Sequence, residues 1–328
     1  MQKNVIMLRS MYYLLFVCLF ASPLLGQEAI NQEKLSDLLA LCDSTRADEI
    51  GIYHKGALVT HWRRDEACAD RIFNTASMVK SWTGLVVGIM IDRGTFKSVD
   101  DPICDYLPDW EAGCQNNITL KDLLTMSAGL FRKGPRGILS KTNMDTYALQ
   151  IEPDTVPGIK FSYSNESVHL LGMAIEAATG KSAQDVFQEV LFTPLGMDST
   201  HLVTDDAGNY VTYGGAQTTV RDAAAVGQLL LNKGTWSGKR IVSEDWINAS
   251  IQPGTYAPYY GYLWWLDTRS EHPNVAAMGD YGKLTIVFPT LDLVFVRAQT
   301  CDLLQDIQMS WMGPSFLKAI AEIVVEKP

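Results

Sequence analysis

The residues best suited to chemistry are a serine and a lysine in the segment Thr75-Ala76-Ser77-Met78-Val79-Lys80. Residues three positions apart share one face of a helix, so Ser77 and Lys80 would project together from its first turn. A serine hydroxyl is a weak nucleophile and needs a base, and a lysine in an apolar cleft can lose its proton and serve as one. The helix N-terminus would stabilise negative charge developing on a reacting oxygen. A simpler interpretation stays open, in which Ser77 caps the helix and Lys80 lies on the surface.

A second group of polar residues is Tyr163-Ser164-Asn165, which leads into a predicted helix. A tyrosine beside a lysine ammonium can have its pKa lowered, and its phenolate could then act as a base. Asn165 offers both a hydrogen-bond donor and an acceptor. The alternative is an ordinary helix start, with Asn165 as the cap and Tyr163 packed in the core.

A third segment, Ala277-Met278-Gly279-Asp280-Tyr281-Gly282-Lys283, precedes a predicted strand at 284–288. Glycines beside a strand let a ligand or a developing oxyanion approach the backbone closely. The alternative interpretation of this segment is a plain hairpin turn.

The three segments, in this order, resemble the motifs of the serine β-lactamase-like hydrolases, the superfamily of class C β-lactamases and penicillin-binding proteins. Those enzymes carry S-x-x-K, then Y-x-N, then a triplet with Lys or His at a strand edge. The resemblance covers about residues 35–325. Other segments similar to the family are Leu123–Leu130, Thr193–Met197, Thr219–Gly234 and Tyr260–Trp265.

The third segment departs from the β-lactamase pattern, because no K-T-G or H-T-G precedes the strand. It is more similar to the A-x-G-x-x-G-Q of the esterase and 6-aminohexanoate-dimer hydrolase branch, with Lys283 where Gln is usual. In the superfamily, the Lys or His of the triplet helps to bind substrate carboxylates. The resemblance therefore favours an esterase or amidase. A β-lactamase or D-alanyl-D-alanine carboxypeptidase, with Lys283 as a partial substitute, is the alternative, and a non-catalytic ligand-binding module is a further one.

The resemblance also implies roles for individual residues. Ser77 would attack a carbonyl and become acylated, Lys80 would take or relay its proton, and Tyr163 would act first as base and then as acid. The backbone N–H groups of Ser77 and Asp280 would form an oxyanion hole. The residues expected to bind or orient substrate are Asn165, Gly279, Asp280, Gly282 and Lys283.

The elements that must position these residues can be read from periodicity, caps and turn residues. The predicted helices cover residues 31–45, 77–92, 119–126, 166–178, 220–232 and 310–325, and another opens at Ser182. The predicted strands cover 50–53, 58–62, 262–266, 284–288 and 293–297.

This order, without strict strand–helix alternation, indicates an α+β fold and not a doubly wound parallel sheet. We expect one antiparallel sheet built from both chain ends and flanked by the terminal helices, in a lobe of about residues 31–75 and 255–328. The residues from about 76 to 254 would form a mainly helical lobe. The site would lie in the groove between them, with walls from the loops around 130–160 and 200–215.

Composition narrows the class of protein. The chain has 328 residues, is 47% hydrophobic and 20% charged, and carries a formal net charge of -10. These values are typical of a globular protein, and the acidity disfavours nucleic acid as a partner. We expect a small-molecule ester, amide or peptide as the substrate. No H-E-x-x-H or C-x-x-C spacing is present, so neither a metal site nor a cofactor is predicted.

The start of the chain is typical of a secretory signal peptide. Lys3 and Arg9 precede the apolar run Met11–Ala21, and small residues follow. We expect cleavage after Gly26, a hydrolase domain at 27–328 with no later membrane span, and a periplasmic or secreted location. A retained membrane anchor is the alternative.

Export would place the cysteines in an oxidising compartment. Cys104 and Cys114 flank a loop that contains a proline, so a local disulfide and a pair of reduced thiols are both open. The pairing of Cys42, Cys68 and Cys301 is not predicted.

Overall fold

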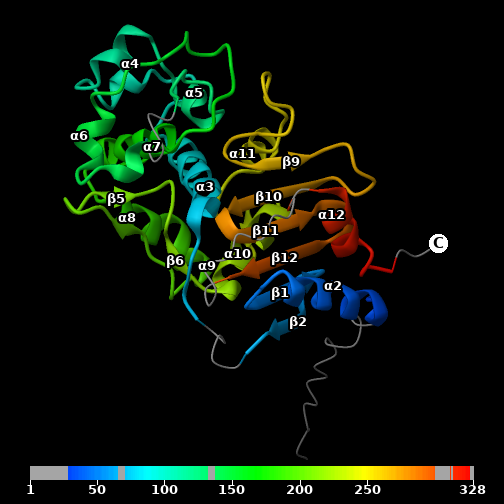
Figure 1. Cartoon of the computed structure of the whole chain (residues 1–328). Coiled ribbons are helices and arrows are strands. Elements are labelled where there is room, and N and C mark those ends of the chain that lie inside the picture. The colour runs from blue at the N-terminus through cyan, green and yellow to red at the C-terminus, as the bar shows by residue number, and fades with distance from the viewer. Residues whose placement is uncertain (1–28, 66–70, 132–136, 300–310, 312, 326–328) are drawn as a thin grey trace, which may run out of the picture.

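The structure is a computed structural model that describes residues 29–65, 71–131, 137–299, 311 and 313–325 (Figure 1). The expected signal peptide at 1–26, together with Cys68 and Cys301, lies outside these residues.

Six strands form one antiparallel sheet in the order β2-β1-β12-β11-β10-β9 (Figure 1). In that order the strands cover Ala57–Arg63, Glu49–His54, Leu293–Ala298, Lys283–Phe288, Asn274–Gly279 and Trp265–Asp267. The N-terminal hairpin joins the C-terminal strands through the β1–β12 pairing, in which Glu49 lies opposite Ala298. The predicted antiparallel sheet built from both ends of the chain is confirmed.

Both faces of this sheet are covered by helices. One face packs against the terminal helices α2 (Gln32–Ser44) and α12 (Pro314–Ala321), and the other packs against α10 (Val220–Leu231). Strands buried on both faces read as continuous apolar runs and not as alternating patterns. Every residue of β11 is buried, which includes the polar Lys283 and Thr285.

The middle of the chain is mainly helical, and its part from α4 to α8 lies at the left and upper left of Figure 1. Its central helix is α3 (Val79–Asp92), which is buried from Val79 to Met90. Around it lie α4 (Glu111–Gln115), α5 (Leu120–Leu124), α6 (Met144–Ala148), α7 (Asn165–Thr179), α8 (Ala183–Phe187), α9 (Thr193–Leu195) and α11 (Glu244–Ser250). Short two-residue strands complete this part: β3 (Phe73–Asn74), β4 (Val203–Thr204), β5 (Tyr210–Val211), β6 (Gln217–Thr218), β7 (Thr235–Trp236) and β8 (Lys239–Arg240).

Several predicted element boundaries are corrected. The helix expected from Ser77 begins as a 3₁₀ turn, η2 (Ala76–Met78), and becomes α-helical only at Val79. The strand expected at 262–266 is β9 at Trp265–Asp267, because Leu263 adopts a left-handed backbone with φ 63° and interrupts the extended chain. The final helix is likewise shorter than expected, since it starts at Pro314, after the cap residue Gly313.

One strand of the six-stranded sheet was not predicted. Residues 274–279 form β10, although Ala276 and Ala277 have low strand propensity. The strand exists because β11 pairs with it along its length, with Ala277 opposite Thr285. Tertiary pairing therefore overrides local preference at this place.

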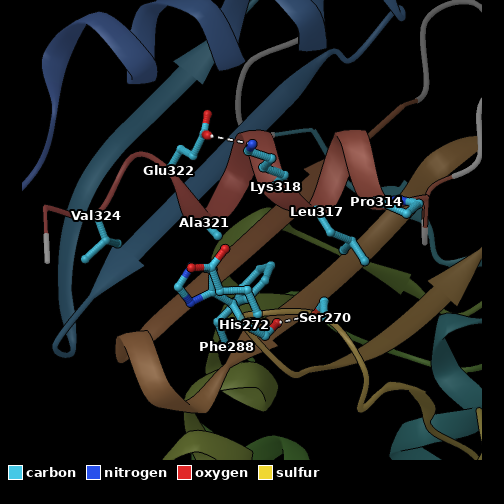
Figure 2. A pocket seen from close by; sticks show the side chains of 10 residues that line it. Ser270, His272, Phe288, Pro314, Leu317, Lys318, Ala321, Glu322 and Val324 are labelled. Atoms are coloured by element: carbon cyan, nitrogen blue, oxygen red, sulfur yellow. Dashed lines mark hydrogen bonds and ion pairs between the residues drawn. The ribbon is translucent and has the colours of Figure 1, made fainter.

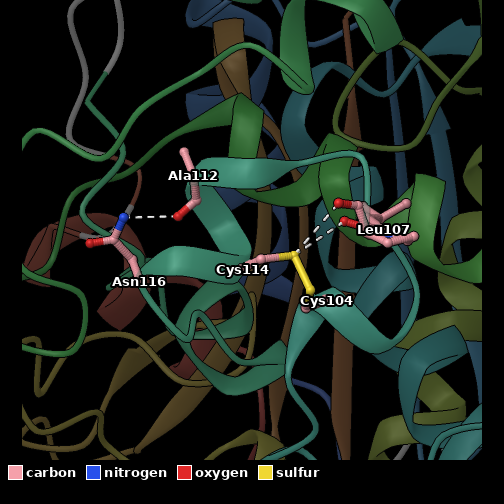
Figure 3. The surroundings of a disulfide bond; sticks show 6 residues. Cys104, Leu107, Ala112, Cys114 and Asn116 are labelled. Atoms are coloured by element: carbon pink, nitrogen blue, oxygen red, sulfur yellow. Dashed lines mark hydrogen bonds between the residues drawn. A yellow bond between two sulfur atoms is a disulfide. The ribbon is translucent and has the colours of Figure 1, made fainter.

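A disulfide joins Cys104, in η3 (Ile103–Asp105), to Cys114, in α4 (Figure 3). The alternative of two reduced thiols is therefore wrong for this pair. Among the described cysteines, Cys42 is free and buried.

The disulfide gives a prediction for stability. Replacing both cysteines (Cys104→Ser with Cys114→Ser) should lower the free energy of unfolding by about 2–3 kcal/mol, because the short loop is then unrestrained in the unfolded chain. Urea denaturation of the oxidised wild type and the double variant measures this difference. Dithiothreitol should remove most of it, and equal stabilities without reductant would contradict the prediction.

Candidate active site

Ser77 lies in a strained turn that leads into α3. The residue before it, Ala76, has a left-handed backbone with φ 46°, which costs a non-glycine residue on the order of 1–3 kcal/mol. Two contacts hold the turn: Ala76 N donates to Asn74 Oδ1 at 2.8 Å, and Gly215 N donates to Ala76 O at 3.1 Å. The turn places Ser77, which is half-buried, at the N-terminal end of the buried central helix.

Lys80 is buried directly beneath Ser77. Its side chain is only 1% exposed, and its Nζ donates to Ser77 Oγ at 3.0 Å and to the Tyr213 carbonyl at 2.6 Å. The amine also lies over two aromatic rings, 5.1 Å from the centroid of Tyr163 and 5.4 Å from that of Tyr213. The interpretation of Lys80 as a surface residue is therefore wrong. The amine is within reach of the hydroxyl proton that it would have to accept.

Tyr163 is a second side chain that is hydrogen-bonded to Ser77. Burial raises the pKa of Tyr163 to about 12, with a smaller upward contribution from the Asp280 carboxylate, although a hydrogen bond with the Ser77 side chain lowers it. A nearby lysine was expected to lower this pKa, but the loss of water around the phenol raises it instead. The ring stacks on Trp265 at 5.6 Å between centroids. Tyr163 is therefore a neutral phenol at neutral pH.

Asn165 is the first residue of α7 but not its cap. The cap is Ser164, whose hydroxyl accepts from Ser167 N at 3.0 Å. Asn165 is thereby left to line the same pocket as Ser77 and Tyr163.

This pocket has a volume of about 430 Å³. Its walls come from the segments around 139–144 and 203–215, so the predicted contribution of the two loop regions is confirmed. The described side chains that line it are mostly apolar or uncharged: Asn74, Ala76, Ser77, Leu139, Met144, Tyr163, Asn165, Val203, Thr204, Val211, Tyr213, Gly214, Gly215 and Asp280.

The end of β10, at Gly279, lies against the turn of residues 75–78, called the nucleophile turn here because it carries the predicted nucleophile Ser77. A Cβ on Gly279 would lie 2.2 Å from Thr75 O and 3.3 Å from Ser77 N, so no larger residue fits there. The chain then continues into η6 (Asp280–Gly282), and Asp280 lines the pocket beside Ser77. This contact places the backbone N–H groups of Ser77 and Asp280 on adjoining segments, which is the arrangement that an oxyanion hole requires.

Gly282 is the last residue of η6 and Lys283 is the first residue of β11, and neither is among the residues that line the pocket. Lys283 is 3% exposed, its Nζ donates to Asp280 O at 3.4 Å, and it lies 5.0 Å from the Tyr281 ring centroid. Burial lowers the pKa of Lys283. Gly282 has φ 68° and packs against Trp311 and Arg297. Lys283 therefore contacts the η6 turn, and Gly282 is part of it.

Tyr213 lies in one of the predicted wall loops, but it was not predicted as a site residue. Its carbonyl accepts the hydrogen bond from Lys80, its ring lies beside the amine, and it lines the pocket. The signal that could have found it is the glycine pair Gly214-Gly215 that follows, because Gly215 contacts the nucleophile turn.

A larger cavity of about 540 Å³ lies elsewhere, between α12 and the strands (Figure 2). None of the predicted site residues lines it. Ser270 is close to His272 there, but its hydroxyl donates to the His272 carbonyl at 2.9 Å, and Lys318 pairs with Glu322 at 3.4 Å. The Ser270 hydroxyl thus donates to a main-chain carbonyl, whereas in the pocket at Ser77 a serine hydroxyl accepts a hydrogen bond from a lysine amine.

Residues 44–303 match the family profile described as Beta-lactamase. The chain belongs to the Beta-lactamase family. This family profile covers the nucleophile turn, the Tyr163 segment and the β10–β11 turn, and the predicted resemblance is confirmed.

Relatives within the Beta-lactamase family include proteins of different activities. The chain is 24% identical over 310 residues to the 6-aminohexanoate-dimer hydrolase of Paenarthrobacter ureafaciens, which covers 84% of this chain and 78% of the relative. Among solved structures, a putative β-lactamase from Bacteroides dorei DSM 17855 gives a TM-score of 0.74 at 20% identity, covering 90% of this chain and all (100%) of the other. A family VIII carboxylesterase gives 0.72 at 18% identity, covering 89% and 96%.

The protein is thus a Beta-lactamase-family hydrolase with the α+β fold of that family. Within the described residues, no helix is both long and apolar enough to cross a bilayer, and no group of three or more metal-ligating side chains occurs.

The raised pKa of Tyr163 gives a prediction for its titration. Because the phenol is neutral, the wild type and Tyr163→Phe should have the same tyrosinate ultraviolet absorbance up to about pH 10, the usual tyrosine pKa. The difference should appear only as the pH approaches 12. A difference that develops between pH 7 and 9 would instead show a phenolate with a lowered pKa and would contradict this assignment.

Proposed function

We propose that the protein is an exported serine hydrolase that cleaves a small ester or amide through an acyl-enzyme on Ser77. The observation that carries the proposal is the position of Ser77 Oγ, which accepts from Lys80 Nζ at 3.0 Å and is hydrogen-bonded to Tyr163. A nucleophile joined to a base that is itself held by a third group is the arrangement that activates serine. The third group here is the Tyr213 carbonyl, which accepts from Lys80.

The proposed reaction begins when Ser77 Oγ attacks the substrate carbonyl and gives its proton to the neutral amine of Lys80. The oxyanion is stabilised by the N–H groups of Ser77 and Asp280. Tyr163, a neutral phenol, protonates the leaving group as the bond to it breaks, and the proton held by Lys80 replaces the one that Tyr163 gave up. Water then attacks the acyl-enzyme by the same steps in reverse, which releases the acid and restores Ser77.

The pocket walls support an uncharged acyl group. Leu139, Met144 and Val211 present apolar surface, and among the described lining residues Asp280 is the charged one. Lys283, which could attract a carboxylate, is 3% exposed and donates to the Asp280 carbonyl. An ester or amide without a carboxylate is therefore favoured over a penicillin or a peptidyl-D-alanine.

Export is part of the same proposal. Residues 1–26 have the pattern of a signal peptide. The Cys104–Cys114 disulfide supports an oxidising compartment, since such bonds are rare in the cytosol.

Intact-mass measurement after exposure to acylating agents tests the activity and the processing together. Protein recovered from the cells that export it should lack residues 1–26 and should gain one adduct from a fluorophosphonate probe. Ser77→Ala should gain none, because the nucleophile is absent. Lys80→Met and Tyr163→Phe should react at least about 10²-fold more slowly.

The matched control is Ser81→Ala, which removes a hydroxyl on the same helix; Ser81 Oγ donates to Leu263 O at 2.6 Å, away from Ser77. This variant should still be labelled. A folded wild type that reacts with no activated ester, β-lactam or D-alanyl peptide would overturn the enzyme proposal. Turnover of β-lactams or D-alanyl peptides faster than esters would reverse the order of the substrate classes.

The charge of the pocket gives a further prediction. Asp280→Asn keeps the backbone N–H but removes the negative charge, so kcat/KM for an ester with a carboxylate should rise several-fold relative to a neutral ester of equal size. Such a change corresponds to on the order of 1 kcal/mol of repulsion across the pocket. The same ratio should rise with salt in the wild type and stay flat in the variant. An unchanged ratio in Asp280→Asn would show that Asp280 does not select by charge.

A further inference from the structure

The turn that carries Asp280 is itself strained. Its middle residue, Tyr281, is 43% exposed and has a left-handed backbone with φ 63°. A non-glycine residue in this conformation persists only where its surroundings over-determine it. The exposed side chain of Tyr281 offers little such support, so the restraint must act through the backbone of the turn.

Two buried cations supply that restraint. Arg297 Nη1 donates to Tyr281 O at 3.1 Å and to Gly282 O at 2.7 Å. Lys283 Nζ donates to Asp280 O at 3.4 Å. All three carbonyls of η6 are therefore held by cationic side chains, and bonds from a charged donor are about twice as strong as neutral ones.

Arg297 is anchored independently of the turn. It lies on β12 opposite Leu284 of β11, is 0% exposed, and its Nη2 donates to Thr45 O at the end of α2. The guanidinium also stacks on Trp311 with 4.4 Å from Cζ to the ring centroid. A Cβ on Gly282 would lie 2.3 Å from Trp311 and 2.7 Å from Nη1, so only glycine admits the guanidinium so close to the turn.

The groups that accept hydrogen bonds from Arg297 indicate what this buried cation holds in place. Burial lowers the pKa of Arg297 to about 10, so the group is still charged at neutral pH. Burying a cation is costly unless its hydrogen bonds are satisfied. This guanidinium donates to three main-chain carbonyls, two of them in the turn beside Ser77, and to Gln299 Oε1 at 3.4 Å.

We propose that Arg297 is a positioning residue for catalysis, which holds the 280–282 turn in the shape that aims the Asp280 N–H into the oxyanion hole. This role rests on the proposed acyl-enzyme function. Arg297 is not among the residues that line the pocket, so it acts through the turn and not on the substrate.

The experiment compares Arg297→Met and Arg297→Lys with the wild type, using a p-nitrophenyl ester and a boronic acid with the same acyl chain. The boronate forms a tetrahedral adduct on Ser77 and depends on the oxyanion hole, whereas KM depends mainly on the pocket walls. Arg297→Met should lower kcat roughly 10- to 100-fold and weaken the boronate by a similar factor, with KM changed less than about twofold. Arg297→Lys, which keeps the charge but not the two-pronged guanidinium, should recover part of both losses.

Lys318→Met is the matched control, because it removes a cation on the same side of the sheet whose side chain is 70% exposed and pairs with Glu322. It should leave kcat, KM and boronate affinity unchanged. Active sites are counted in each sample with the fluorophosphonate probe, so that kcat refers to folded, reactive enzyme.

Each outcome decides the matter. A normal kcat per active site in Arg297→Met, or a loss of boronate affinity no larger than the change in KM, overturns the positioning role and leaves the proposed function intact. Failure of both arginine variants to fold would assign Arg297 to stability alone and would overturn it as well. A wild type that the probe does not label would overturn the proposed function itself.

Discussion

The approach of β10 to the nucleophile turn is the contact on which the site depends. Gly279 has no side chain, and the space that a Cβ would need is occupied by the Thr75 carbonyl, 2.2 Å away. Because Gly279 has no Cβ, the backbone of β10 can contact the backbone of the turn that leads into α3. This contact brings Ser77 and Asp280 to adjoining positions although they are distant in the sequence. A methyl group at residue 279 would push the two segments apart at the place where a reacting carbonyl must be held.

Around this contact, polar groups are buried and each is given partners. Lys80 is held by Ser77 Oγ and the Tyr213 carbonyl, and Tyr163 is packed against Trp265 while bonded to Ser77. Burial of this kind destabilises the ionised form of a side chain, which is why the pKa of Tyr163 is raised. The same low dielectric strengthens every hydrogen bond that remains. The hydrogen bonds of the site thus join Ser77 to both Lys80 and Tyr163.

The nucleophile turn and the β10–β11 turn each contain a residue with a strained backbone. Ala76 and Tyr281 are non-glycine residues with positive φ, at 46° and 63°, and each lies next to one of the two N–H groups assigned to the oxyanion hole. The nucleophile turn is held by Asn74 and Gly215, and the β10–β11 turn is held by Arg297 and Lys283. Lys283 could stand in for the Lys or His of the β-lactamase triplet, which helps to bind substrate carboxylates. Its side chain instead donates to the main-chain carbonyl of Asp280. The pocket is left with apolar walls and the carboxylate of Asp280.

The local features of this protein follow from its sequence alone. Caps such as Thr219 and Ser182, the spacing of Ser77 and Lys80, and the apolar runs of the sheet depend on neighbours along the chain. The longer helices and five of the six strands of the main sheet follow from these features. The motif residues and their family could be recognised for the same reason. Tertiary structure decided what depends on distant neighbours. It made a strand of 274–279 through pairing with β11, raised the pKa of Tyr163 through burial, and directed Lys283 to the turn. It also brought Tyr213 and Arg297 to the site. Pairing, desolvation and the direction of a side chain are set by atoms far away in the sequence, so no local pattern could have contained them.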